Sequence, residues 1–150
     1  MHKNYRIYLT ALIIFFSSCK KNNSPASAPI DASGTWSTSS LSNATSGFSI
    51  SAAQYPCLAS NKLILNNDGT LSQTYVGIDT CYMTKLPLYI LGIPGSSSPG
   101  TWTQTGDSVI THIEGIPKPG LGVVSKTSTG YQLLIKDSVV NSIGVSILIR

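Results

Sequence analysis

The sequence is poor in the side chains that carry out acid–base and nucleophilic chemistry. Its 150 residues include only two histidines, His2 and His112, and six acidic residues. A nucleophile needs a neighbouring base, and one histidine outside the extreme N-terminus, with no Gly-x-Ser-x-Gly motif, offers no such pair. No glycine-rich loop precedes a helical pattern to hold phosphate. We therefore expect a protein that is not an enzyme and that has no cofactor.

The acidic residues do not suggest a catalytic pair either. A glycosidase would need two well-placed carboxyl groups. Asp68 and Asp107 fall in predicted turns, and Asp31 falls in a predicted flexible segment. The other three are interpreted as ordinary surface acids: Asp79, Glu114 and Asp137. A binding or interaction role is therefore favoured over hydrolysis.

Helical periodicity is also lacking. Beyond Gly34 no segment repeats its apolar residues every 3.6 positions over three turns, whereas short β-branched and aromatic runs alternate with clusters of Gly, Pro, Asn and Asp. The pair Asp68-Gly69 between two such runs predicts one hairpin, and Gly106-Asp107 predicts another. The sequence therefore predicts an all-β domain whose neighbouring strands follow one another along the chain.

The second half of the chain predicts two further strands, at residues 131–136 and 139–149. In the last strand one face carries Ile143, Val145, Ile147 and Ile149, and we expect this face to lie in the core. Residues 95–99 and 115–122, rich in glycine and proline, predict loops.

Residues 86–94 are strongly apolar but carry prolines at both ends, which favours an edge strand or a hydrophobic loop. A lid over a cavity and a patch that meets a partner are the alternatives. A buried edge strand is the favoured interpretation.

The apolar run near the N-terminus is too short to cross a membrane. Residues 7–16 contain no charge and follow His2, Lys3 and Arg6. Ten helical residues rise only about 15 Å, half of a hydrocarbon core of about 30 Å. A short basic segment followed by such a run is typical of a secretory signal peptide.

Ser17, Ser18 and Cys19 follow this run, and the arrangement resembles the lipobox of bacterial lipoproteins. In that family a diacylglycerol is attached to the cysteine and the chain is cleaved before it. The resemblance implies a signal peptide of residues 1–18 and a membrane as partner, reached through lipid on Cys19. Phe16 departs from the leucine preferred there, which bears on the efficiency of cleavage. An ordinary secretory peptide with a chance cysteine is the alternative.

Residues 19–33 are small and polar and predict a flexible tether. Lys20 and Lys21 either meet anionic headgroups or belong to a solvated linker. Removal of Lys3 and Arg6 leaves eight basic side chains against six acidic ones, a small excess that argues against nucleic acid as a partner. We expect a lipid-anchored protein of the bacterial cell envelope, on the outer membrane rather than the inner one, facing the periplasm or the surface.

Two cysteines remain if Cys19 carries lipid. Cys57 lies 11 residues before Asp68 and Cys81 lies 13 residues after it, so a reversal of the chain at Asp68 brings them nearly opposite. We expect a disulfide, whose loop of roughly 25 residues would contribute about 3 kcal/mol. A metal-binding or redox-active pair is the competing interpretation. The sequence has no C-x-x-C motif, however, and His112 alone adds too few ligands for a zinc site.

Several short motifs together resemble the lipocalin-like domains of bacterial lipoproteins. They are Gly34-Thr35-Trp36, a cysteine on each side of Asn67-Asp68-Gly69-Thr70, and Gly100-Thr101-Trp102 before Gly106-Asp107. The resemblance runs over residues 34–150 and implies an antiparallel up-and-down barrel, closed or half-open, with about 8–10 strands and Trp36 plugging one end. Most members of the family have no known activity. The chain departs from the pattern at residues 82–99 and 117–119.

A barrel of this size either fills its interior with side chains or holds one small ligand. The first hypothesis is therefore a protein that binds a small, mostly apolar ligand. The alternative is an interaction protein with a filled barrel, an accessory subunit or an inhibitor. The aromatic residues to look for around a cavity are Trp36, Trp102, Tyr75, Tyr89 and Tyr131, although such residues are core more often than ligand-contacting. The sequence assigns no ligand-binding residue.

Overall fold

The protein is built almost entirely of antiparallel strands. The computed structural model describes residues 28–43, 45–83, 89–139 and 142–150. Its elements follow one another as β1 (Gly34–Asn43), β2 (Phe48–Ser51), the 3-10 helix η1 (Pro56–Ser60), β3 (Asn61–Leu65), β4 (Thr70–Tyr75), β5 (Cys81–Met83), β6 (Tyr89–Gly92), β7 (Ser97–Thr105), β8 (Ser108–Ile113), β9 (Gly120–Lys126), β10 (Tyr131–Val139) and β11 (Ser142–Ile149). None of the helical structure in these residues has the length and apolar character that a membrane span requires.

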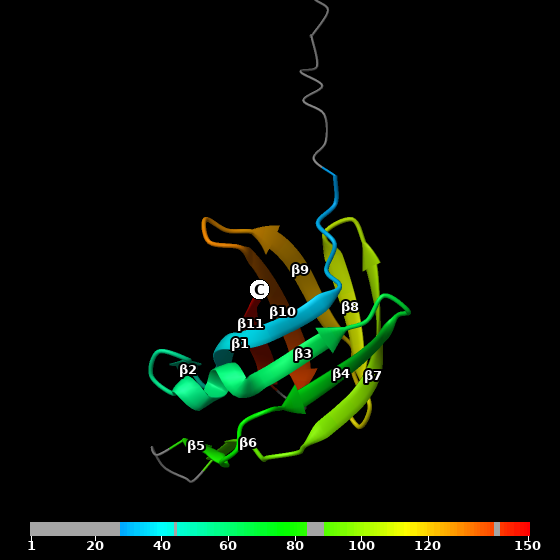
Figure 1. Ribbon diagram of the computed structural model, residues 1–150. Helices are drawn as coiled ribbons and strands as arrows, with labels where there is room; N and C mark the ends of the chain where they lie inside the picture. Colours follow the sequence, from blue (N-terminus) through cyan, green and yellow to red (C-terminus); the bar gives the residue numbers. More distant parts are fainter. Residues whose placement is uncertain (1–27, 44, 84–88, 140–141) are drawn as a thin grey trace, which may run out of the picture.

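Eight of the strands close into a barrel (Figure 1). They are neighbours in the order β11, β10, β9, β8, β7, β4, β3 and β1, and β1 pairs in turn with β11. Each of these pairings is antiparallel. The prediction of an all-β, antiparallel up-and-down barrel is therefore confirmed. Outside the ring, β2 extends the sheet beside β1, and β5 pairs with β6.

Both predicted hairpins are present. Between β3 and β4, Gly69 has a φ of 82°, and Asp68 Oδ1 accepts hydrogen bonds from the backbone N–H of Thr70 at 2.9 Å and from its hydroxyl at 2.6 Å. Between β7 and β8, Gly106 has a φ of 60°. These are left-handed backbone conformations that favour glycine, so the turn residues set where each strand reverses.

The turns divide the barrel into two ends. The end at which the chain enters the barrel, which we call the entry end, carries the start of β1 and the β3–β4, β7–β8 and β9–β10 turns. Arg150 follows β11 at the same end. The opposite end, which we call the cavity end, carries the last residues of β1, with β2, η1, β5 and β6 beside it (Figure 1). In an up-and-down barrel successive connections alternate between the two ends, so each end is built from residues far apart in sequence.

The main apolar core fills the entry half of the barrel. Each of the eight barrel strands contributes at least one buried side chain to it: Trp36, Leu63, Leu65, Leu71, Trp102, Val109, Val124, Leu133, Ile135 and Leu148. Trp36 is fully buried, and its Nε1–H donates a hydrogen bond to Ala32 O at 2.8 Å. The largest side chain of the core is therefore buried with its polar atom satisfied.

The segment before β1 belongs to this core. Ala32 is fully buried, and its N–H donates to Gln104 Oε1 at 2.9 Å. Ile30 packs against the core, and its N–H donates to Asp107 Oδ1 at 3.2 Å. The folded domain therefore includes residues 30–33, which the composition had assigned to the tether.

The inner face of β11 is the opposite of the predicted one. Leu148 is 4 % exposed and lies in the core beside Leu133, its partner on β10, whereas Ile149 is 50 % exposed. The prediction that Ile143, Val145, Ile147 and Ile149 form the core face is therefore wrong at the described side chains. It failed because the outer face of this part of the barrel is apolar too, so alternation alone did not identify the inner one.

Two predicted loops are partly strands. β7 begins at Ser97 and β9 at Gly120. Glycines suggested a loop at residues 115–122, but Gly120 and Gly122 make room for neighbouring side chains. A Cβ on Gly122 would lie 3.2 Å from Leu133 Cδ1, and one on Gly120 would lie 2.9 Å from Ile135 Cγ2. These glycines therefore allow strands to approach and do not interrupt them.

A second, smaller core lies beside the cavity end. Ile50 and Leu58 are buried there, surrounded by the partly buried side chains of Leu41, Phe48, Ala52, Tyr55 and Leu91. Cys57 of η1 and Cys81 of β5 form a disulfide with their Cα atoms 5.6 Å apart. The predicted bond is confirmed, and it ties the β5–β6 pair to η1.

Candidate functional site

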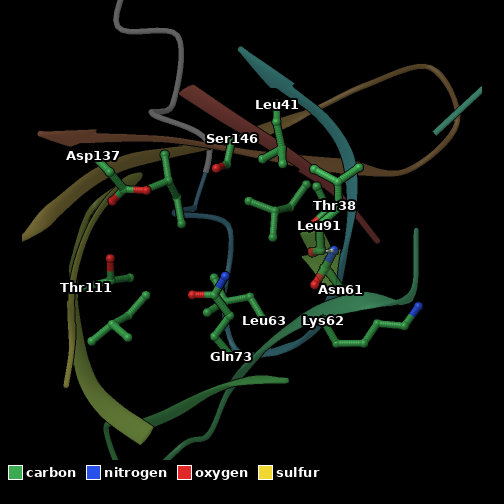
Figure 2. A pocket seen from close by; sticks show the side chains of 13 residues that line it. Thr38, Leu41, Asn61, Lys62, Leu63, Gln73, Leu91, Thr111, Asp137 and Ser146 are labelled. Carbon is green, nitrogen blue, oxygen red and sulfur yellow. Dashed lines mark hydrogen bonds between the residues drawn. The ribbon is translucent and has the colours of Figure 1, made fainter. Parts of the chain in front are cut away.

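A cavity of about 100 Å³ lies inside the barrel at the cavity end (Figure 2). Its apolar wall is made of Leu41, Leu63, Leu91, Ile113, Ile135 and Leu148. Its polar wall is made of Thr38, Asn61, Gln73, Thr111, Asp137 and Ser146. The interior of the barrel thus changes from apolar core to a mixed, part-polar surface along its axis.

Most of the polar wall has no hydrogen-bond partner among the described residues. Thr38, Gln73, Asp137 and Ser146 form no side-chain hydrogen bond with another described residue, although their side chains point into the barrel (Figure 2). No described side-chain nitrogen or oxygen that is sealed from solvent lacks a partner. The unpaired atoms of the cavity are therefore those that a small molecule can reach. Buried polar groups are normally hydrogen-bonded, so this wall is suited to a ligand or to water.

Asp137 and Thr111 lie close together in one corner of the cavity. Thr111 is 2 % exposed, and its one hydrogen bond among described residues, to Gly120 O, is long at 3.5 Å. A Cβ on Gly120 would lie closer than 3.0 Å to both Asp137 Oδ1 and Thr111 Oγ1, so the two oxygens are less than about 6 Å apart. Figure 2 shows them on the same side of the cavity. The absence of a side chain at position 120 leaves room for both.

The electrostatics of the cavity are set by one carboxyl group. Burial raises the pKa of Asp137 above its usual value of 3.8, with no basic group contributing. Lys62 is the other charged residue of the described lining, but its Nζ donates to Ser37 Oγ at 2.7 Å and points away from the cavity (Figure 2). The ionised carboxyl is therefore not compensated by a cation from the described lining.

A second hollow adjoins the cavity on the side of β4, β6 and β7. It encloses about 340 Å³, and Asn61, Gln73 and Leu91 line both spaces. Asn61 Nδ2–H donates to Leu91 O at 3.0 Å, which holds β6 against the barrel here. These three side chains form the boundary that the hollow and the cavity share.

The outer face of β8, β9 and β10 carries a further feature, which we call the outer patch. Ile110, Leu121 and Val123 are 40–58 % exposed there. Ile110 pairs with Leu121 across β8 and β9, and Val123 pairs with Leu134 across β9 and β10. Exposed apolar residues on adjacent strands form a contiguous surface of the kind found at interaction sites.

The residues singled out in the sequence lie in different parts of the structure. Cys57 and Cys81 meet, whereas Cys19 and the proposed signal peptide lie outside the described residues. Of the apolar stretch at residues 86–94, residues 86–88 also lie outside them, and the rest contains β6, which among the described strands pairs with β5 alone. Leu91 of this strand packs on the second core, whereas Ile93 after it is 52 % exposed. Of the aromatic residues, Trp36 and Trp102 are core, Tyr75 is buried with its hydroxyl donating to Asp79 O at 2.7 Å, and Tyr131 packs on the core. None of these four lines the cavity. The side chain of Tyr89 is not described.

Asp137 is the functional candidate that sequence reasoning missed by treating it as a surface acid. The period of two that places Leu133 and Ile135 inside the barrel also places Asp137 inside, so the signal was present in the strand itself. Within the described chain, no three His, Cys, Asp or Glu side chains gather where they could hold a metal ion.

Comparison with protein-family models, curated proteins and solved structures finds no match. The all-β barrel is established by the strand pairing. The resemblance to lipocalin-like lipoproteins stays a prediction from short motifs.

Proposed function

We propose that this protein is a lipid-anchored envelope protein that binds a small molecule at the cavity end of its barrel. The observation that carries the proposal is the polar wall, where Thr38, Gln73, Asp137 and Ser146 point inward without a described hydrogen-bond partner. Ligand sites combine an apolar surface with a few such convergent polar groups. The mixed lining favours a small amphipathic ligand over the mostly apolar one expected from the sequence.

A binding role fits this site better than catalysis. The described lining includes one carboxyl group and neither histidine nor cysteine, whereas hydrolysis by paired acids needs two carboxyl groups. His112 is exposed on β8 and belongs to the outer surface. The proposal therefore assigns Asp137 to recognition.

Native mass spectrometry of the full chain, purified gently from a bacterial host, tests the binding role. The matched variants are Ser146→Phe, which fills the cavity, and Ser125→Phe, which adds the same bulk on the exposed side of β9. A small molecule that accompanies the wild type and Ser125→Phe but not Ser146→Phe supports the proposal. The absence of any adduct from all three proteins contradicts it, as does an adduct that Ser146→Phe retains.

The anchor is tested separately by cell fractionation. We expect the wild type in the membrane fraction and Cys19→Ser in the soluble exported fraction, because lipid on Cys19 supplies the attachment. The mass of the mature N-terminal peptide should include the diacylglycerol. An unmodified peptide beginning elsewhere would favour the ordinary secretory alternative.

The outer patch favours a second candidate function, that of an interaction protein. In that case a protein partner seen with the wild type by native mass spectrometry should be lost with Val123→Glu and kept with Ser146→Phe. If only Ser146→Phe loses the partner, the cavity and not the outer patch carries the function.

A further inference from the structure

We propose that the ligand of the cavity carries a protonated amine, which is held between the Asp137 carboxylate and the Thr111 hydroxyl above Gly120. This inference rests on the proposed function of ligand binding at the cavity end. It names the chemical class of the ligand and the group that recognises it.

The first step of the argument is charge. Asp137 pairs with Gly144 on β11 and lies over Gly120 of β9, so both neighbouring strands present glycine beside the carboxyl group. Lys62 directs its Nζ to Ser37 on the outside. A partly buried carboxylate without a counter-ion is unfavourable, and a ligand that brings a positive charge relieves this.

The second step is geometry. Asp137 Oδ1 and Thr111 Oγ1 lie less than about 6 Å apart on the same side of the cavity. Hydrogen bonds from an ammonium nitrogen are about 2.7–3.2 Å long, so one such group can reach both oxygens. An ammonium group has three donors and no acceptor, which matches a corner that offers oxygen atoms.

The third step concerns the rest of the ligand. Much of the rest of the cavity wall is aliphatic, with Ile113, Ile135 and Leu148 among its members. The volume of about 100 Å³ admits only a few non-hydrogen atoms. The site therefore fits a small alkylamine, or the amine end of a longer molecule that extends into the adjoining hollow past Gln73 and Leu91. A divalent metal ion is a poorer fit, because it would require more oxygen ligands of higher charge.

The titration of Asp137 gives supporting evidence. Its raised pKa reflects burial without a compensating cation. A bound ammonium group favours the ionised carboxylate, so affinity for an amine should fall as pH is lowered through that pKa. The groups that face Asp137 are Thr111, Gly120 and Gly144, none of which titrates, and Lys62 points away. The expected pH dependence therefore belongs to Asp137 itself.

The test compares two matched probes, propylamine and 1-propanol, by NMR titration of the full chain with the wild type and two variants. Asp137→Asn keeps the shape of the side chain and removes its charge. Glu114→Gln makes the same type of change at an exposed acid outside the cavity. For the wild type and Glu114→Gln at pH 7 we expect propylamine to bind at least about tenfold more tightly than 1-propanol. Asp137→Asn should reduce this preference to less than twofold while leaving the alcohol affinity unchanged.

A pH series on the wild type gives an answer even if the variant folds poorly. The preference for propylamine should shrink as pH falls through the raised pKa of Asp137 and be lost well below 3.8, and the affinity for 1-propanol should stay constant. Equal binding of both probes at pH 7, or a preference that survives in Asp137→Asn or well below pH 3.8, overturns the inference and leaves the cavity as a binding site. If neither probe shifts the resonances of the cavity residues, the inference and the proposed cavity function both fail.

Discussion

The two ends of the barrel differ in the side chains that fill them. At the entry end both indole N–H groups are satisfied, Trp36 by Ala32 O and Trp102 by Asn66 O, each at 2.8 Å. The Arg150 guanidinium lies 4.7 Å from the centroid of the Trp36 ring and also stacks on Tyr131. Both tryptophans are therefore buried in the core with their polar atoms paired.

At the cavity end the inward positions change character on the same strands. On β10, Leu133 and Ile135 are followed inward by Asp137, and on β11 Leu148 is preceded by Ser146. Small or polar side chains replace large apolar ones, and several lack a described partner. We expect the entry end to supply most of the stability and thus the rigid strands on which the proposed binding site lies, because a binding site is most precise on rigid elements.

The largest expected effect is a loss of stability from truncation at the entry end. Trp36→Ala should lower the free energy of unfolding by about 3–5 kcal/mol, since it empties the centre of a close-packed core. Leu91→Ala, at the half-buried cavity wall, should cost less than about 2 kcal/mol. Urea unfolding measures both. Equal losses would contradict the division of the barrel into a stabilising end and a binding end.

The disulfide should have the next largest effect, and it acts beside the cavity end. Replacing Cys57 and Cys81 together by serine should lower the free energy of unfolding by about 3 kcal/mol, because the bond closes a loop of 24 residues in the unfolded chain. Hydrogen exchange should show the greatest loss of protection around η1, β5 and β6. Loss of protection spread evenly to the entry end would show that the two ends unfold as one unit.

Replacing Arg150 tests the packing of the entry end, and we expect a smaller loss in the free energy of unfolding. Arg150→Met should lose about 1–2 kcal/mol, since it removes two cation–π contacts and hydrogen bonds to Ser33 O and Asp31 O. Lys126→Met, an exposed basic residue at the end of β9, should change unfolding by less than about 0.5 kcal/mol. If both variants behave alike in thermal unfolding, the Arg150 stack contributes nothing to the closed end.

The fold was the part most accessible from the sequence, and turn chemistry explains why. Asp68 and Gly69 reverse the chain through one left-handed residue and local hydrogen bonds, so four consecutive residues suffice to predict the hairpin. The Cys57–Cys81 bond followed from that reversal. Distances along the chain decide both features.

The inner faces were less accessible, because they depend on which neighbours a strand meets. The alternation of side chains along β11 fits either face pointing inward. Only its pairing with Leu133 and with Thr38 identifies Leu148 as the inward residue. The start of β9 was missed because Gly120 resembles a loop residue, although its role is to make room for Thr111 and Asp137. The cavity follows from these long-range contacts, which spacing along the chain does not reveal.

The smallest effect we expect is a gain of stability at the cavity end. Because burial raises the pKa of Asp137, the folded state binds its proton more tightly than the unfolded chain does. The carboxyl group therefore lowers stability progressively as pH rises from about 3.8 through the raised pKa, and the full cost is present at pH 7. Asp137→Asn should be more stable than the wild type at pH 7, by less than about 1 kcal/mol because the group is partly solvated. The difference should vanish well below the usual pKa.

Asp68 at the entry end provides the control of opposite sign. Hydrogen bonds from the hydroxyl and the backbone N–H of Thr70 lower the pKa of Asp68, so its ionised form stabilises the fold above the usual pKa and this stability is lost as pH falls through the lowered one. Asp68→Asn should therefore be less stable than the wild type at neutral pH. Urea unfolding of both variants at pH 7 and about pH 2.5 compares the two ends directly. A loss of stability at pH 7 in Asp137→Asn would mean that the carboxyl is a structural partner, as Asp68 is, and that the cavity end is packed for stability and not for a ligand.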